Sequence, residues 1–163
     1  MKKVFNLAYR LSGDFHAAND ITQETFMRAY RGFEKFEGRS RVFTYLYTIT
    51  CNVWKNSLRK KGFQTFTSYS LQPGAPEIDP PAKELSPCEE LGREERQRIV
   101  RECIDSLPPG EKAIIILRDM EGRKYEEIAS ILGCRPGTVK SRLARARKKL
   151  SEKLLPLMEV MDK

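Results

Sequence analysis

The stretch YEEIASILGCRPGTVKSRLARARKKL, residues 125–150, decides how the second half of this chain folds. Its apolar residues recur with helical spacing in two segments, which are separated by a short break from Gly133 to Pro136. Glycine suits the left-handed residue that closes a helix, and proline suits the first turn of the next helix. The stretch therefore predicts a helix-turn-helix.

The second of these helices carries its charge on one side. From Arg135 to Lys153 the chain has eight basic residues and a single acidic one, Glu152. The alternative is a helical hairpin whose basic face is only exposed to solvent, but such faces usually contain charges of both signs. We therefore interpret this face as a DNA-binding surface whose first turns enter the major groove. The opposite, inward stripe is formed by Val139, Leu143, Ala146 and Leu150.

The longer run LPPGEKAIIILRDMEGRKYEEIASILGCRPGTVKSRLARARKKL resembles domain four of bacterial RNA polymerase sigma factors, and most of all that of the extracytoplasmic-function (ECF) group. The combination of LPP-E, EIA with LG, and GTVKSRL-RARKKL carries the resemblance, because EIA with TVK alone also occurs in LuxR-type regulators. The resemblance implies that the helix-turn-helix reads the minus-thirty-five promoter element. The matching positions are Arg135, Pro136, Gly137, Thr138, Lys140, Ser141, Arg142, Arg145 and Arg147.

Charge is distributed unevenly along the 163 residues, whose formal net charge is +8. Residues 1–61 carry 12 basic and 5 acidic side chains, and residues 96–163 carry 16 and 10. The intervening residues 62–95 carry only 2 basic and 7 acidic side chains. Two basic blocks that flank an acidic connector indicate a polyanionic partner.

Several classes of protein are disfavoured by the composition. No apolar run is long enough to span a membrane, and the N-terminus lacks the pattern of a signal peptide. The cysteines have no CxxC spacing and His16 is the single histidine, so we expect no metal site and a cytoplasmic protein with reduced thiols. No catalytic or cofactor-binding motif occurs, which favours a binding protein that is not an enzyme and needs no cofactor.

The first basic block predicts three helices, over residues 4–12, 15–31 and 42–60, with Asp14 as the N-cap of the second. Aromatic and basic residues alternate along the third helix, as they do where single-stranded nucleic acid is bound, although aromatic residues at helical spacing are more often part of a core. We expect the second helix to turn inward Ile21, Thr25, Phe26, Ala29, Tyr30 and Phe33. We expect the third to turn inward Val42, Leu46, Ile49 and Val53.

The run AANDITQETFMRAYRGFEKFEGRSRVFTYLYTITCNVWKNSLRK resembles domain two of the ECF sigma factors. The resemblance implies docking on the clamp helices of the largest polymerase subunit through Asp20, Gln23, Glu24, Phe26 and Arg28. It implies recognition of the minus-ten element through Arg39, Arg41, Phe43, Tyr45, Asn52, Lys55, Asn56 and Arg59.

This chain departs from the pattern of domain two at three places. It has Tyr45 where the family usually has tryptophan, which keeps an aromatic ring, and Asn56 where the family usually has aspartate, which could alter the base preference. It also begins about one helix later than the family does. Either the true start lies upstream, or domain two, expected over residues 1–61, is shortened here.

Between the two blocks, residues 62–88 include five prolines and show no periodicity, which predicts a flexible acidic linker. Beyond it we expect helices over 89–107 and 111–120, then the helix-turn-helix, with fraying near Pro156, all within a domain of residues 89–163. The fold expected is all-α, with two small helical domains joined by the linker.

The function that the resemblance implies is that of an ECF sigma factor, which guides polymerase to promoters and helps to melt them. Its partners would be promoter DNA, core RNA polymerase and an anti-sigma factor. Two alternatives remain open. One is a free-standing helix-turn-helix regulator, and the other is a sigma-like protein that binds polymerase or an anti-sigma factor without promoter activity.

Overall fold

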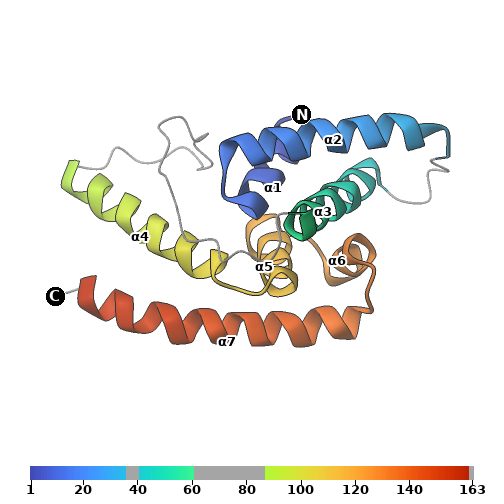
Figure 1. Cartoon of the computed structure of the whole chain (residues 1–163). Helices are drawn as coiled ribbons and strands as arrows, with labels where there is room; N and C mark the ends of the chain where they lie inside the picture. Colours follow the sequence, from blue (N-terminus) through green and yellow to red (C-terminus); the bar gives the residue numbers. More distant parts are fainter. Residues whose placement is uncertain (36–40, 61–86, 162–163) are drawn as a thin grey trace.

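A computed structural model describes residues 1–35, 41–60 and 87–161, and every regular element in these ranges is helical, as expected for an all-α fold (Figure 1). The first half comprises α1 (Lys2–Ser12), α2 (Phe15–Gly32), the short η1 (Phe33–Lys35) and α3 (Val42–Lys60). The second half comprises α4 (Pro87–Asp105), α5 (Pro109–Ile115), the π-helical turn η2 (Ile116–Met120), α6 (Tyr125–Leu132) and α7 (Pro136–Met161).

The first half is a three-helix unit in which α1, α2 and α3 all pack on one another. Gly13 takes a left-handed conformation, with a φ of 73°, and its N–H donates to the carbonyl of Tyr9, which closes α1. The Asp14 carboxylate then accepts a hydrogen bond of 2.7 Å from the N–H of Ala17, so it is the N-cap of α2 that the sequence predicted. The tight turn folds α2 back along α1.

The helix-turn-helix is confirmed. Gly133 adopts a left-handed conformation, with a φ of 65°, at the end of α6, and the N–H of Cys134 donates to the carbonyl of Ala129. Pro136 is the first residue of α7. The predicted inward stripe is also found, because Val139, Leu143 and Ala146 are buried and Leu150 is half-buried.

The centre of the molecule is the apolar run from Ala113 to Leu117, all of it buried. It can be apolar on every side because α5 packs against α7 on one side while η2 packs against α1 on the other. In Figure 1, α5 and α6 lie between α3 above and α7 below. Buried residues of both halves belong to one hydrophobic cluster, so the two predicted helical domains pack on one another.

This shared core changes which side of α3 is buried. The expected inward residue Val42 is 52% exposed, whereas Tyr47 and Trp54, which were not among the expected inward residues, are 0% and 2% exposed. The second half covers the Tyr47 and Trp54 side of α3 through α6 and α5. Tyr30 of α2 and Phe33 of η1, both expected to face inward, are instead 83% and 61% exposed, because the stripe of smaller residues ending at Ala29 already fills the contact with α1 and α3.

The last helix also differs from expectation, since α7 continues through Pro156 to Met161 and does not fray there. Proline inside a helix removes one backbone hydrogen bond and costs about 3 kcal/mol. Packing of α7 along α4 offsets that cost, and the Lys153 ammonium adds a 2.5 Å hydrogen bond to the Ser106 hydroxyl at the end of α4.

Candidate functional site

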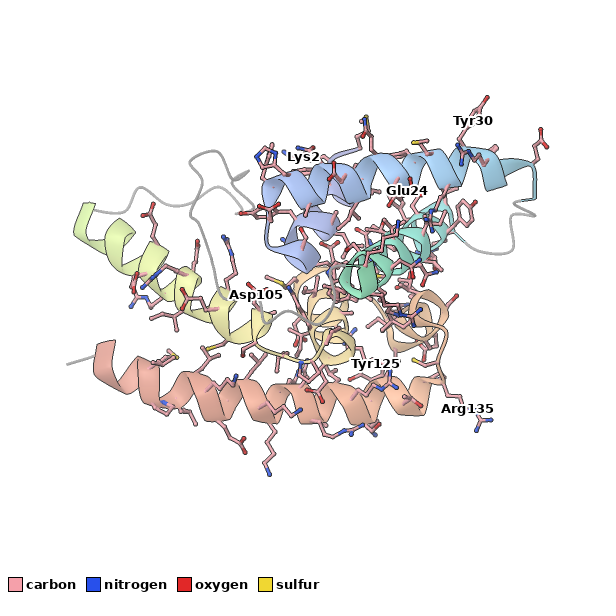
Figure 2. All side chains as sticks on the ribbon, in the orientation of Figure 1. Lys2, Glu24, Tyr30, Asp105, Tyr125 and Arg135 are labelled. Atoms are coloured by element: carbon pink, nitrogen blue, oxygen red, sulfur yellow. The ribbon has the colours of Figure 1, made fainter. Side chains whose placement is uncertain are left out.

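The candidate site on α7 lies at the beginning of the helix, directly after the turn that follows α6. The carbonyl of Arg135 accepts hydrogen bonds from the N–H groups of Thr138 and Val139, which starts the first turn. Figure 2 shows the Arg135 side chain pointing away from the rest of the molecule at this corner. Of the predicted DNA-binding residues, Thr138 and Arg142 are half-buried, and the others are exposed: Arg135, Pro136, Gly137, Lys140, Ser141, Arg145 and Arg147.

The basic residues of α7 divide into two groups according to their partners. Towards its middle, Arg147 forms two hydrogen bonds to Asp119, of 2.5 and 3.2 Å, and this contact raises the pKa of the guanidinium. The Lys149 ammonium lies 3.0 and 2.9 Å from the two carboxylate oxygens of the buried Glu111. These pairs join α7 to η2 and α5, so they fix the orientation of α7 on the domain.

The second group occupies the N-terminal end of α7. Within the described part of the chain, Arg135, Lys140, Arg142 and Arg145 form no ion pair. Their charges are therefore not neutralised by any carboxylate within residues 1–35, 41–60 and 87–161. We call these four residues the free cations. Cations in this state can contact phosphates, or the acceptor edge of guanine in the case of arginine.

The predicted minus-ten residues lie in three places on α3 and just before it, apart from Arg39, which falls outside the described residues. Asn52, Asn56 and Arg59 are exposed, and Lys55 beside them is half-buried. Their spacing of three and four residues places them on one side of the helix. This polar face offers amide and cationic groups to a ligand.

The second place is an apolar groove of about 580 Å³ between the end of α2 and the start of α3. Tyr45 is half-buried there, with its hydroxyl 3.5 Å from the carbonyl of Ala29. Gly32 permits this position, because a Cβ atom at residue 32 would lie only 2.6 Å from the Tyr45 hydroxyl oxygen. The groove is lined by Phe26, Ala29, Tyr30, Phe33, Val42, Tyr45 and Leu46.

Two other predicted residues lie near the N-terminus of α3 without lining the groove. Arg41 is exposed, and its carbonyl accepts hydrogen bonds from Thr44 and Tyr45 in the first turn of the helix. Phe43 is 44% exposed, and the Lys3 ammonium lies 4.9 Å from its ring centroid. A cation at this distance from a ring is a favourable contact, so Phe43 belongs to a separate exposed patch.

The predicted polymerase-docking residues occur along the outer side of α2. Asp20, Gln23 and Arg28 are exposed, Glu24 is half-buried, and Phe26 is half-buried at the groove. Glu24 accepts a 2.6 Å hydrogen bond from the Arg28 guanidinium one turn further on. These five residues all lie on α2, with Phe26 at the groove, and their role in docking stays a prediction.

Sequence reasoning missed two apolar members of the α2 surface. Met27 is 48% exposed, and Tyr30, which Figure 2 shows projecting from α2, is 83% exposed. The buried stripe Ala18, Ile21, Thr22, Thr25 and Ala29 uses only small and branched residues. That complete stripe was the available signal that the larger neighbours lie outside it. Exposed large apolar side chains beside charged ones are typical of protein interfaces.

The described residues offer no site for metal chemistry, since no group of three potential ligands occurs among them. Burial raises the pKa of the Cys51 thiol to about 12, so this cysteine stays protonated and inert at neutral pH. None of the helices in the described ranges is long and apolar enough to cross a membrane.

Two family models match this chain. Residues 1–64 match the model described as sigma-70 region 2, and residues 97–150 match the model described as sigma-70, region 4. The ECF RNA polymerase sigma-E factor of Escherichia coli strain K12 is 39% identical across 96% of this chain and 83% of that protein. The RNA polymerase sigma-H factor of Pseudomonas aeruginosa is 36% identical across 96% and 82%. The sigma-E factor of Haemophilus influenzae is 37% identical across 85% and 75%.

Two solved structures have the same fold. The sigma factor RpoE of Bartonella quintana, crystallised in complex with the anti-sigma factor NepR, aligns with a TM-score of 0.72 and 28% identity. The alignment covers 94% of this chain and 90% of that one. CnrH, solved in complex with the cytosolic domain of CnrY, aligns with a TM-score of 0.66 at 23% identity, a likeness of fold alone.

Proposed function

This chain belongs to the extracytoplasmic-function sigma factors of bacterial RNA polymerase, and from that premise we propose how its surfaces divide the work of promoter recognition. Residues 1–61 read the minus-ten element and bind polymerase. Residues 89–163 read the minus-thirty-five element, and residues 62–88 connect the two. The chain acts by binding alone, with no cofactor and no catalytic group of its own.

The free cations at the start of α7 bind the minus-thirty-five element. A recognition helix enters the major groove by its N-terminal turns, where Arg135, Lys140, Arg142 and Arg145 lie. Small residues Gly137 and Ser141 on the same exposed surface let the backbone approach the DNA closely. Arg147 contributes less directly, since its pair with Asp119 holds α7 in place. This unpaired positive charge is the observation that carries the proposal.

The groove and the polar face of α3 take the minus-ten element as single-stranded DNA. The groove has an apolar and aromatic lining and is large enough for an unstacked base, which gains about 1–3 kcal/mol by stacking on an aromatic ring. Asn52, Asn56 and Arg59 then contact the strand beside it. Strand opening in this scheme is driven by the binding of exposed bases.

The outer side of α2 binds the clamp helices of the largest polymerase subunit. Asp20, Gln23 and Glu24 supply polar contacts, and Met27 and Tyr30 add apolar area to the same surface. The Bartonella relative was solved with an anti-sigma factor, and we propose that this chain is also controlled by a protein of that class.

The test is run-off transcription with purified core polymerase and a promoter selected by the protein from random sequence. We expect transcription with the parent chain, a loss of roughly tenfold or more with Arg142→Ala, and a similar loss with Gln23→Ala. Lys148→Ala, which changes an exposed α7 cation paired with Glu152, is the matched control and keeps most of the activity.

Two results would count against the proposal. Tight sequence-specific binding by the chain alone, unaffected by polymerase, would indicate a free-standing regulator. Stable binding to polymerase with no transcription from any selected promoter would indicate a sigma-like protein without promoter activity.

A further inference from the structure

Helices α1 and α3 together form a surface whose charged residues are all basic. Neither helix contains an aspartate or a glutamate, whereas α2, which packs on both of them, exposes Asp20. Near the start of the two helices, Lys2, Lys3 and Arg41 are exposed, and none of them forms an ion pair with a carboxylate that the structure describes. A surface with one sign of charge is suited to the backbone of a nucleic acid.

One aromatic ring lies within this basic surface. Phe43, in the first turn of α3, is 44% exposed, and the Lys3 ammonium of α1 lies 4.9 Å from its ring centroid. The preceding residue, Val42, is 52% exposed and lines the apolar groove. Successive residues of a helix are rotated by about 100°, so the Phe43 ring lies beside the groove and not within it.

The contact between Lys3 and Phe43 is weak enough to be replaced by a nucleotide. An exposed cation–π contact stabilises by a factor of about two to five, whereas a base that stacks on an aromatic ring gains roughly 5- to 150-fold in affinity. A stacking base therefore displaces the ammonium from the ring. Lysine has a flexible four-carbon stem and three N–H donors, so the displaced ammonium can turn to the phosphate of the same nucleotide.

We propose that Lys3 and Phe43 form a second nucleotide site next to the groove. In the free protein the Lys3 ammonium lies over the ring. In the complex with single-stranded minus-ten DNA, one base occupies the groove, the neighbouring base stacks on Phe43, and Lys3 binds the phosphate of that neighbouring nucleotide. Lys3 is thus a DNA-positioning residue on α1, a helix for which the sequence predicted no DNA contact. This inference rests on the proposed function of the groove and adds to it a second base and the cation that holds its phosphate.

The first test measures binding of the polymerase complex to a single-stranded oligonucleotide that carries the minus-ten element of a selected promoter. Each nucleotide is replaced in turn by an abasic residue, which removes the base and keeps the phosphate. We expect two neighbouring positions at which this replacement weakens binding by about threefold or more. In Phe43→Ala, one of the two positions loses its effect, while the other keeps it because the groove is intact. Phe43 is exposed, so its removal leaves the core unchanged.

The second test examines Lys3 through the phosphate of the position that depends on Phe43. A methylphosphonate at that position removes the negative charge and should weaken binding by the parent by about twofold or more. In Lys3→Ala the same replacement has no further effect, because the cation that contacts this phosphate is absent. Lys3→Ala also reduces the slope of log affinity against log salt by about 0.7, as expected for one phosphate contact on a single strand.

Two further variants serve as controls for Lys3. Lys3→Arg keeps the positive charge, so it retains the response to the methylphosphonate. Lys2→Ala removes an exposed cation one residue away, and it responds to the methylphosphonate as the parent does. A merely structural role of Lys3 in holding the ring would not produce this pattern, because it involves no phosphate.

The possible failures of this inference are distinguishable from failure of the proposed function. If at least one abasic position weakens binding but none depends on Phe43, the second nucleotide site does not exist. If Lys3→Ala and the methylphosphonate weaken binding independently, Lys3 does not hold this phosphate. If the parent responds at no position and binds all single strands alike, the proposed recognition of the minus-ten element fails together with this inference.

Discussion

Helices α3 and α7 each expose one side and bury the other, yet their exposed residues are selected by different forces. On α7, ion pairs with carboxylates of the same half determine which cations are neutralised, since Arg147 pairs with Asp119 and Lys149 pairs with Glu111. On α3, apolar packing decides which aromatic residues are available, since Tyr45 lines the groove while Tyr47 faces the other half. The presence of a suitable residue type therefore does not establish that it can reach DNA. The residues that pack against it or pair with it determine that.

The largest expected effect comes from removing the core that supports both helices. Leu117 is fully buried in the shared core. Leu117→Ala should lower the free energy of unfolding by about 2–5 kcal/mol, because it leaves a cavity. Urea unfolding followed by Trp54 fluorescence and by circular dichroism measures this. We expect both signals to change at one lowered midpoint, and separate midpoints would show that the two halves unfold independently.

A matched pair of substitutions sharpens the comparison on α7 itself. Arg145→Ala, which removes a free cation, should weaken promoter binding by the polymerase complex by roughly 1–3 kcal/mol and reduce its salt dependence. Arg147→Ala removes a cation already paired with Asp119, and exposed pairs contribute less than about 1 kcal/mol. Binding measured across salt concentrations distinguishes them. Equal losses of binding free energy in the two variants would mean that Arg147 contributes as much to promoter binding as Arg145 does, despite its pairing with Asp119.

On α3, the corresponding test uses the close approach of Gly32 to Tyr45. Gly32→Ala places a Cβ atom 2.6 Å from the Tyr45 hydroxyl oxygen, which displaces the ring and should reduce promoter opening several-fold. Combining it with Tyr45→Phe removes the clashing atom, so the double variant should regain opening. Permanganate reactivity of the promoter bubble is the measurement. A double variant as poor as Gly32→Ala would indicate that the helix end, and not the groove, was damaged.

The effect that is smallest near neutral pH is an alkaline loss of stability on the buried side of α3. Burial and the Glu121 contact raise the pKa of Tyr47 from 10.0 to about 12, and burial raises that of Cys51 from 9.0 to about 12. Both groups stay protonated in the folded state but ionise earlier when unfolded, so stability should fall as the pH rises from about 9 towards 12.

Urea midpoints between pH 9 and 11 would measure that fall. In Tyr47→Phe, the loss of stability caused by ionisation of Tyr47 above pH 10 should be absent. The loss caused by Cys51, which begins near pH 9, should remain. If this variant and the parent had the same pH dependence, then Tyr47 would ionise alike in the folded and unfolded chains.

Local features of the fold were predictable from the sequence. The Asp14 cap, the Gly133 turn and the inward stripe of α7 follow from residue types at fixed spacing, and the structure has all three. Such features depend on contacts within one or two turns. The family resemblance likewise rested on short motifs whose matches were confirmed.

What the sequence analysis missed depends on contacts between distant segments. Helical spacing alone could not show that Tyr47 and Trp54 face the second half, because each side of α3 offers apolar residues. The available signal was the run Ala113–Leu117, which is apolar on every side and therefore needs cover from two directions. The pairing of Arg147 was similarly hidden, since Asp119 lies 28 residues earlier in the chain.

The shared core also has a consequence for the order in which the protein is made. The side of α3 that contains Tyr47 and Trp54 leaves the ribosome before the residues up to Ile131 that cover it exist. On the order of 70 residues remain to be added at about 5–20 residues per second, so that side of α3 stays exposed for roughly 4–14 s. Each new molecule thus begins with its first half uncovered.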